Sequence, residues 1–418
     1  VLGYWGLDSP PLSAYQSWAH GKLVAWLEPE AVALGESRGY ETASSKRAMR
    51  LTALLSDLLF MFPAAAAAVN ALYPRESPGS RLWALAVILL NPGFVLIDHG
   101  HFQYNCISLG LTLAATALIC RGRRLLGSAC YVLALNHKHM SLYHSLAFFA
   151  HLLGWALHRP RPGAKIEAFL SLAATVGLTF ALVWWPFFRH SKELALAVLA
   201  RLAPVSRGVF EDYVANFWCV THVAIKWKRM LNQPAMVKVC AATTVAACLP
   251  GVVHQVRRPS KKGLVICMLT CSLAFYLFSY QVHEKSILLA SLPAALLALE
   301  DPAHAVYFAF IAAHSMFPLL VKDGLVTAYC ACLALFLSLA SLRAGVLRGR
   351  IRLPFLASVA AGLGLNALKV AAMPPAKYPF LFDLFISAFA FAHFLYFFAF
   401  WNYRLLLSPT EREKQKDM

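Results

Sequence analysis

The sequence is poor in charged residues, and acidic residues are the scarcer kind. Only 14% of the 418 residues are charged and 59% are hydrophobic, whereas an average soluble domain is about 25% charged. This shortage excludes an ordinary soluble domain and predicts a polytopic membrane protein. Lys and Arg outnumber Asp and Glu by 38 to 20, for a net charge of +18. Because the basic residues cluster between apolar runs, we interpret the charge as membrane topology and predict no nucleic-acid partner.

Cysteine is nearly absent outside the apolar segments. Of the ten cysteines, only Cys219 lies outside an apolar run. This placement indicates neither a disulfide framework nor a metal site. The chain also starts at Val1, with no initiator methionine and no signal peptide. We therefore expect a preceding segment to be missing.

Long apolar runs recur from Leu51 onward, and most are close to the about 20 residues that a spanning helix needs. They predict an all-α polytopic membrane protein with about 13 transmembrane helices. The expected spans are 51–72, 82–98, 103–120, 125–136, 140–158, 167–188, 235–255, 263–281, 286–300, 303–321, 324–342, 353–373 and 379–401. Residues 12–50 are too polar to span and predict helices at the membrane surface.

The distribution of Lys and Arg sets the expected orientation. Alternate short loops carry basic clusters, such as 121–124 and 257–262, and the short loops between them hold only Lys138, Lys285, Lys322 and Lys377. By the positive-inside rule the basic loops are cytosolic. The expected organisation is a lumenal segment at 1–50, helices at 51–188, a long lumenal loop at 189–234, helices at 235–401 and a cytosolic tail at 402–418.

The long lumenal loop and the first residues are both candidates for function. A loop as long as 189–234 is usually functional, although an amphipathic surface helix with Phe217 and Trp218 as interface anchors is an alternative. Asp8 stands just ahead of Pro10 and Pro11, which stiffen the local backbone. A stiff turn suits a catalytic carboxylate. The alternative is that Asp8 caps a helix starting near Leu12.

Three polar clusters lie at span ends on the expected lumenal side, the side of Asp8. They are residues 98–105, residues 136–139 with Tyr143 and His144, and residues 281–285. Each histidine alone could be an interhelical hydrogen-bonding residue, but the convergence of all three clusters favours a site. The histidine pairs are two residues apart, which is a poor spacing for zinc, so we predict no metal and no cofactor.

Several multi-residue motifs occur together and in order. Their sequence resembles the endoplasmic reticulum glucosyltransferases that use dolichyl phosphate glucose and have the type C membrane glycosyltransferase fold. Ser9 stands where the family usually has an aromatic residue, and His137 and His139 replace more usual residues. The motifs are Trp5-Gly-Leu-Asp8 with Pro10-Pro-Leu12, Asp98-His-Gly-His-Phe-Gln-Tyr-Asn105, Ala134-Leu-Asn136 with Leu142-Tyr-His-Ser145, Arg207-Gly208 with Phe210-Glu-Asp212, Val214-Ala-Asn-Phe-Trp218 and Gln281-Val-His-Glu-Lys285.

The resemblance implies an activity, a location and a set of site residues. The closer match is to the branch that adds the first glucose, in α-1,3 linkage, to the nine-mannose oligosaccharide on dolichyl pyrophosphate. It implies an inverting, metal-independent enzyme in the endoplasmic reticulum membrane, with its site lumenal and Asp8 as general base. Glu284 either binds substrate or only neutralises Lys285. The candidate substrate-binding residues are His99, His101, Gln103, Tyr104, Asn105, Lys138, Arg207, His283, Glu284 and Lys285.

Three other interpretations stay open at this stage. The sister enzyme adds the second glucose and shares several of these motifs. A secondary transporter would also have many spans and polar residues at membrane depth, but transporters tend to show internal repeats, and none is evident here. An inactive homologue acting as a structural subunit is a third possibility, which the presence of Asp8 argues against.

Overall fold

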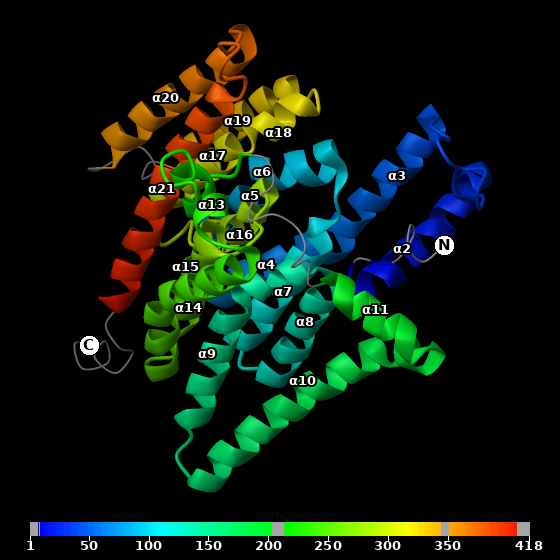
Figure 1. Ribbon diagram of the computed structural model, residues 1–418. Helices are drawn as coiled ribbons and strands as arrows, with labels where there is room; N and C mark the ends of the chain where they lie inside the picture. Colours follow the sequence, from blue (N-terminus) through cyan, green and yellow to red (C-terminus); the bar gives the residue numbers. More distant parts are fainter. Residues whose placement is uncertain (1–6, 8, 203–212, 344–350, 408–418) are drawn as a thin grey trace. The chain divides into compact units, whose positions relative to one another are not determined.

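The computed structural model describes residues 7, 9–202, 213–343 and 351–407. The described chain is helical and contains no β-strand, as the apolar runs predict (Figure 1). It divides into two compact units. The first unit comprises Val1–Pro74, Phe102–Leu142 and Glu167–Pro204, and the second comprises Arg75–His101, Tyr143–Ile166 and Val205–Met418.

The first unit contains helices from three separate stretches of the chain. They are α2 (Pro11–Leu27), η1 (Pro29–Val32), α3 (Ala43–Ser56), η2 (Asp57–Met61), α4 (Phe62–Leu72), α7 (Asn105–Cys120), α8 (Arg124–His137), most of α10 (Pro162–His190) and α11 (Lys192–Leu202). α7 packs between α4 and α8. Gly110 of α7 makes the closest approach, because a Cβ atom there would lie 2.8 Å from the backbone of Phe60. Phe60 belongs to η2, a π-helical turn inside the α3–α4 helix.

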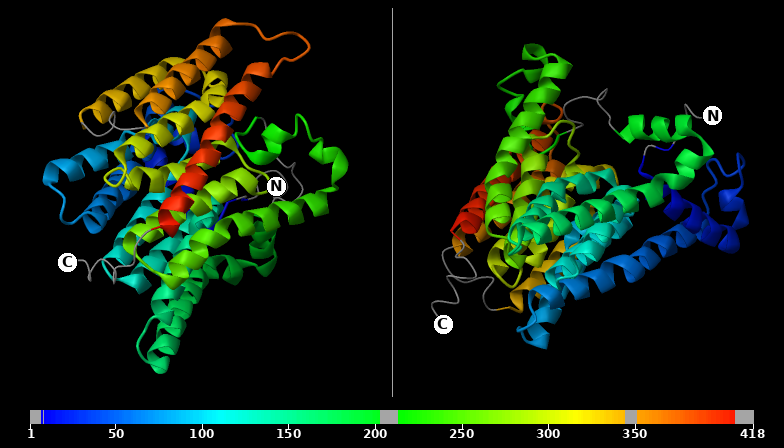
Figure 2. Two further views of the ribbon diagram at one scale, coloured as in Figure 1. Left: turned by 90° about the vertical axis from the view of Figure 1, so that its left-hand side faces the viewer. Right: turned by 90° about the horizontal axis from the view of Figure 1, so that it is seen from below.

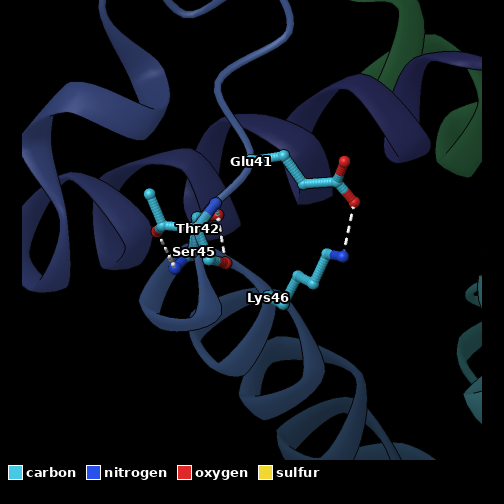
Figure 3. Close-up of polar contacts among 4 residues, drawn as sticks. All are labelled: Glu41, Thr42, Ser45 and Lys46. Atoms are coloured by element: carbon cyan, nitrogen blue, oxygen red, sulfur yellow. Dashed lines mark hydrogen bonds and ion pairs between the residues drawn. The ribbon is translucent and has the colours of Figure 1, made fainter.

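The α3 helix begins earlier than the apolar run predicts. Thr42 is its N-cap, with its hydroxyl accepting from the Ser45 backbone N–H at 3.0 Å and its own N–H donating to the Ser45 hydroxyl at 3.0 Å (Figure 3). Lys46 adds an exposed ion pair of 2.7 Å to Glu41. This capping box fixes the start at Ala43. From there α3, η2 and α4 continue as one helix of 30 residues, whereas the predicted span starts at Leu51.

The second unit is built around helices that are buried on all sides. It contains α5 (Pro78–Leu89), α6 (Pro92–Val95), η3 (Leu96–Phe102), the end of η4 (His139–His144), α9 (Ser145–Leu157), α12 (Phe217–Thr221), α13 (Trp227–Met230), α14 (Gln233–Arg257), α15 (Lys261–Phe278), η5 (Glu284–Ile287), α16 (Leu288–Leu296), α17 (Pro302–Ser315), α18 (Phe317–Lys322), α19 (Val326–Ser341), α20 (Arg352–Ala371) and α21 (Leu381–Leu406).

Aromatic side chains fill the centre of the second unit. Phe308 of α17 is fully buried and meets Phe394 and Phe397 of α21 with ring centroids 5.7 Å and 5.0 Å apart. Such edge and tilted contacts add specificity to apolar burial. α20 and α21, orange and red in Figure 2, pack against each other. The core therefore consists of α15, α16 and α17, with α14 and α21 packed against it.

Six described helices are long and apolar enough to cross a membrane. They are Ala43–Leu72, Pro162–His190, Gln233–Arg257, Lys261–Phe278, Arg352–Ala371 and Leu381–Leu406. The bent pair Pro78–Leu89 and Pro92–Phe102 would make a seventh. Every predicted span coincides with helix, but several of these helices are short, such as α16 with 9 residues. The structure thus supports a multi-pass membrane protein, and the count of about 13 spans stays a prediction.

The expected long loop is partly helical, and one interpretation of it is wrong. Within 189–234 the chain forms α11, α12 and α13. Trp218 is not an interface anchor, because it is only 2% exposed and its indole N–H donates to the Phe278 carbonyl at 2.7 Å. It packs with Met236 and Cys240. Burial by neighbouring helices has overridden the surface preference that the local sequence suggests.

Candidate functional site

The segment beside Asp8 is anchored on both sides, although Asp8 itself, like Arg207, lies outside the described residues. On one side Leu7 packs against Val183, Trp184 and Val198, and its carbonyl accepts a 3.2 Å hydrogen bond from Arg201. On the other side Pro10 is extended and caps α2. The N-cap position therefore belongs to Pro10, two residues after Asp8, which weakens the capping interpretation of Asp8.

Lys138 and two amide side chains form a cluster in the first unit. Lys138 follows α8 as its C-cap, and its ammonium donates to the Gln103 amide oxygen at 3.1 Å and, by a very short contact, to that of Asn105. The Asn105 amide also donates to Gln103 at 3.2 Å. The structure therefore brings together three predicted residues from 98–105 and 136–139. Because amide oxygens are uncharged, these contacts orient the ammonium without neutralising it.

Tyr104 points away from that cluster toward the N-terminal helices. Its hydroxyl lies 2.7 Å from the Thr52 hydroxyl, and its ring lies 5.0 Å from the ring of His20. Next to it Gln16 connects two histidines: its amide nitrogen lies 3.0 Å from His20 and its oxygen 2.9 Å from His137. Burial lowers the pKa of both histidines, that of His137 to about 3. Both rings are therefore neutral at physiological pH.

The second unit holds a chain of three groups around His101. The imidazole Nδ1 lies 2.7 Å from a carboxylate oxygen of Asp323, and Nε2 lies 3.1 Å from the ammonium of Lys285. His101 comes from the π-helical turn η3 and Lys285 from η5. π-helical turns are frequent at functional sites. The structure thus joins two candidate residues, His101 and Lys285, and adds Asp323, which the sequence motifs do not include.

The other predicted residues of the second unit lie on the same two segments. His99 is exposed, His283 is half-buried, and Glu284 is buried to 9% exposure. Glu284 makes no ion pair with Lys285 in the described chain, so the interpretation that it only neutralises that lysine is not supported. Lys285 contacts His101, and His101 in turn contacts the carboxylate of Asp323.

Tyr143 and His144 are core residues of the second unit. The Tyr143 ring stacks on Phe275 with centroids 5.0 Å apart. His144 is fully buried and bonds to the Leu289 carbonyl at 2.8 Å. For these two positions the interhelical role that the sequence left open is the one observed. The described residues contain no group of three or more His, Cys, Asp or Glu that could hold a metal ion.

Comparisons with known proteins identify the family. Residues 1–400 match the ALG6, ALG8 glycosyltransferase family. The chain is 43% identical over 425 residues to the probable dolichyl pyrophosphate Man9GlcNAc2 alpha-1,3-glucosyltransferase of Arabidopsis thaliana, covering 96% of this chain and 78% of that protein.

Two vertebrate relatives are named dolichyl pyrophosphate Man9GlcNAc2 alpha-1,3-glucosyltransferase. The Gallus gallus protein is 38% identical and the Mus musculus protein 40% identical, each over 442 residues that cover 99% of this chain and 87% of the relative. These comparisons do not support the interpretation of the chain as a transporter. From its match along 400 residues and these relatives, the chain belongs to the ALG6, ALG8 glycosyltransferase family.

Proposed function

We propose that this protein transfers the first glucose from dolichyl phosphate glucose to dolichyl-pyrophosphate-linked Man9GlcNAc2. The new linkage is α-1,3, and the product is a precursor of N-glycans. The observation that carries the proposal is the shared name of relatives that align with nearly the whole chain. The proposal includes the endoplasmic reticulum membrane, a lumenal site and the type C fold with about 13 spans.

The reaction inverts the anomeric centre in one displacement. The donor is a β-linked glucosyl phosphate and the product is an α-glucoside. An inverting hydrolase needs an acid and a base, but a phosphate leaving group has a second pKa of about 6 and departs as an anion. One carboxylate base is therefore enough. We assign it to Asp8, which takes the proton from the mannose 3-hydroxyl as that oxygen attacks C1 of glucose.

Charge that develops on the departing phosphate needs donors already in place. Lys285 is the first candidate, because its ammonium is oriented by His101 and two of its three N–H groups remain for an anion. His283 and Arg207 are further candidates. In the first unit Lys138, with Gln103 and Asn105, offers a second cation with amide groups suited to sugar hydroxyls or phosphate. His99, Tyr104 and Glu284 complete the proposed set.

An acceptor comparison tests this function directly. Full-length protein in detergent is given dolichyl phosphate glucose and either Man9GlcNAc2 or its monoglucosylated form on dolichyl pyrophosphate, with and without EDTA. We expect transfer to Man9GlcNAc2 only, unchanged by EDTA. Transfer only to the monoglucosylated acceptor would assign the protein to the sister activity. The proposal would be overturned if folded protein bound neither the donor nor the lipid-linked acceptors and transferred glucose to neither acceptor.

A further inference from the structure

We propose that Asp323 is a positioning residue for glucosyl transfer, acting through His101 on Lys285. None of the sequence motifs includes Asp323, and it lies in a short connection between two helices. Three contacts within the second unit support this proposal: Asp323 to His101 at 2.7 Å, His101 to Lys285 at 3.1 Å, and the packing of Gly100 on Leu325. The inference rests on the proposed function, which gives Lys285 its phosphate.

The backbone fixes the position of Asp323. Asp323 is the C-cap of α18, and Gly324 follows with φ +69°, a conformation that favours glycine. The Leu325 N–H bonds back to the Leu320 carbonyl at 2.8 Å and the Gly324 N–H to the Val321 carbonyl at 3.1 Å. These are the two bonds of a Schellman motif. The carboxylate therefore projects from a rigid turn rather than from a mobile loop.

The same turn packs against the π-helical turn that carries His101. A Cβ atom at Gly100 would lie 2.8 Å from a methyl group of Leu325, so only a residue without a side chain fits this approach without moving Leu325. Gly100 precedes His101, and Leu325 comes two residues after Asp323. The apolar contact and the 2.7 Å polar contact therefore align the two turns together, which makes the Asp323–His101 pair part of a built interface.

The chemistry of the three groups assigns the protons. A carboxylate only accepts and an ammonium only donates. Nδ1 of His101 must then carry a proton, which it donates to Asp323, and Nε2 must be the acceptor of a Lys285 N–H. His101 is thus neutral and held in one tautomer by Asp323. Fixing a histidine tautomer by a carboxylate on its other nitrogen is a common way to orient a functional group.

This arrangement directs the ammonium of Lys285. One of its three N–H groups is bound by His101, and its direction sets the other two. Without Asp323 the ring could rotate or change tautomer, and an Nε2–H would face the ammonium instead of a lone pair. Lys285 would then leave its position, and the developing phosphate charge would lose an oriented donor. The expected defect lies in turnover and donor use rather than in acceptor binding.

The test compares variants of the full-length protein, with each substrate varied in turn while the other is saturating. Asp323→Asn keeps the shape of the side chain but can present an N–H to the ring, and we expect kcat/KM for the donor to fall about 10- to 100-fold. Asp323→Glu should recover much of that loss because it restores the charge. The acceptor KM should stay within about twofold of wild type in both variants.

Glu41→Gln is the matched control, since it also removes a carboxylate from an ion pair, but from an exposed one (Figure 3). It should leave the activity unchanged.

A double-mutant cycle separates positioning from a general structural role. If Asp323 acts through His101, adding Asp323→Asn to His101→Gln should cost little further activity. Full additivity of the two losses, or normal donor kinetics in Asp323→Asn, would overturn the proposal. Should Asp323→Asn unfold, the cycle is run with Asp323→Ser, which also removes the charge. An inactive wild type would instead refute the proposed glucosyltransferase function, so the two failures are distinguishable.

Discussion

Lys138 in the first unit and Lys285 in the second are both held by polar side chains, and the chemistry of those partners differs. Lys138 donates to the uncharged amide oxygens of Gln103 and Asn105. Lys285 donates to His101, which in turn faces the carboxylate of Asp323. Amide oxygens thus orient the first ammonium, whereas a carboxylate acts on the second through an imidazole. The two cations therefore differ in the chemistry of the groups that orient them.

Removing each lysine is the strongest way to test this comparison. Lys285→Met leaves His101 with an uncompensated carboxylate, so an approaching phosphate meets negative charge as well as a missing donor. We expect a loss of at least about 100-fold in kcat/KM for the donor. Lys138→Met leaves two neutral amides, and the expected loss is about 10-fold. Steady-state kinetics with each lipid varied in turn measures both. Equal losses would remove the distinction between the two clusters.

Two glycines, one in each unit, extend the comparison to the packing beside the two lysine clusters. Gly110 lies on α7, the helix that begins at Asn105, and Gly100 precedes His101; an added Cβ would approach its neighbour to 2.8 Å in both cases. At Gly110 the neighbour is the Phe60 backbone, which cannot turn aside, so Gly110→Ala should destabilise the protein by about 1–3 kcal/mol. At Gly100 it is the flexible end of Leu325, so Gly100→Ala should cost less stability.

Thermal unfolding in detergent, with Gly177→Ala as control, measures this difference. A Cβ at Gly177 would meet nothing within 4 Å, and replacing a glycine inside a helix with alanine is favourable when space allows. Gly177→Ala should therefore not lower the melting temperature. A Gly110→Ala protein as stable as wild type would mean that α7 and η2 are not in close contact.

The smallest expected effect concerns pH and the first unit. Burial lowers the folded-state pKa of His137 to about 3, from 6.5. The unfolded chain therefore binds this proton first as the pH falls. The stability that His137 contributes is complete above about pH 6.5 and decreases as the pH falls from there toward 3. Nearby Lys138 and His20 act in the same direction.

Melting temperatures between pH 7 and 4 test the role of His137. The wild type should lose stability on acidification more steeply than His137→Gln, whose amide can still bond to Gln16 without taking up a proton. Parallel slopes for the two proteins would show that His137 is not held neutral by burial.

The sequence predicts what depends on local pattern, and misses what depends on packing. Apolar runs located helix in every expected span, because hydropathy is a property of the segment itself. The start of α3 at Ala43 depends on a capping box that the apolar run does not contain. Trp218 looks like an interface anchor by type and position, yet neighbouring helices bury it. Burial of that kind follows from tertiary contacts between segments far apart in sequence.

The candidate site shows the same division. Five residues that the structure joins in two groups were candidates already, because they occur in dense polar motifs at expected span ends: Lys138 with Gln103 and Asn105, and His101 with Lys285. Asp323 and Arg201 were missed because neither lies in a dense polar motif. Only the fold shows that one faces His101 and the other holds the Leu7 carbonyl beside Asp8. The sequence did contain one signal for Asp323, namely a carboxylate next to Gly324 at the end of an apolar run.

The most direct test of the account is the activity of Asp8→Asn. Full-length wild type and variant, checked for equal melting temperature, are assayed with dolichyl phosphate glucose and lipid-linked Man9GlcNAc2, and the anomeric configuration of the new linkage is determined. The account predicts α-1,3-linked glucose from the wild type and a loss of about 100- to 10,000-fold in the variant, the range for losing a general base. Undiminished transfer by Asp8→Asn would contradict it.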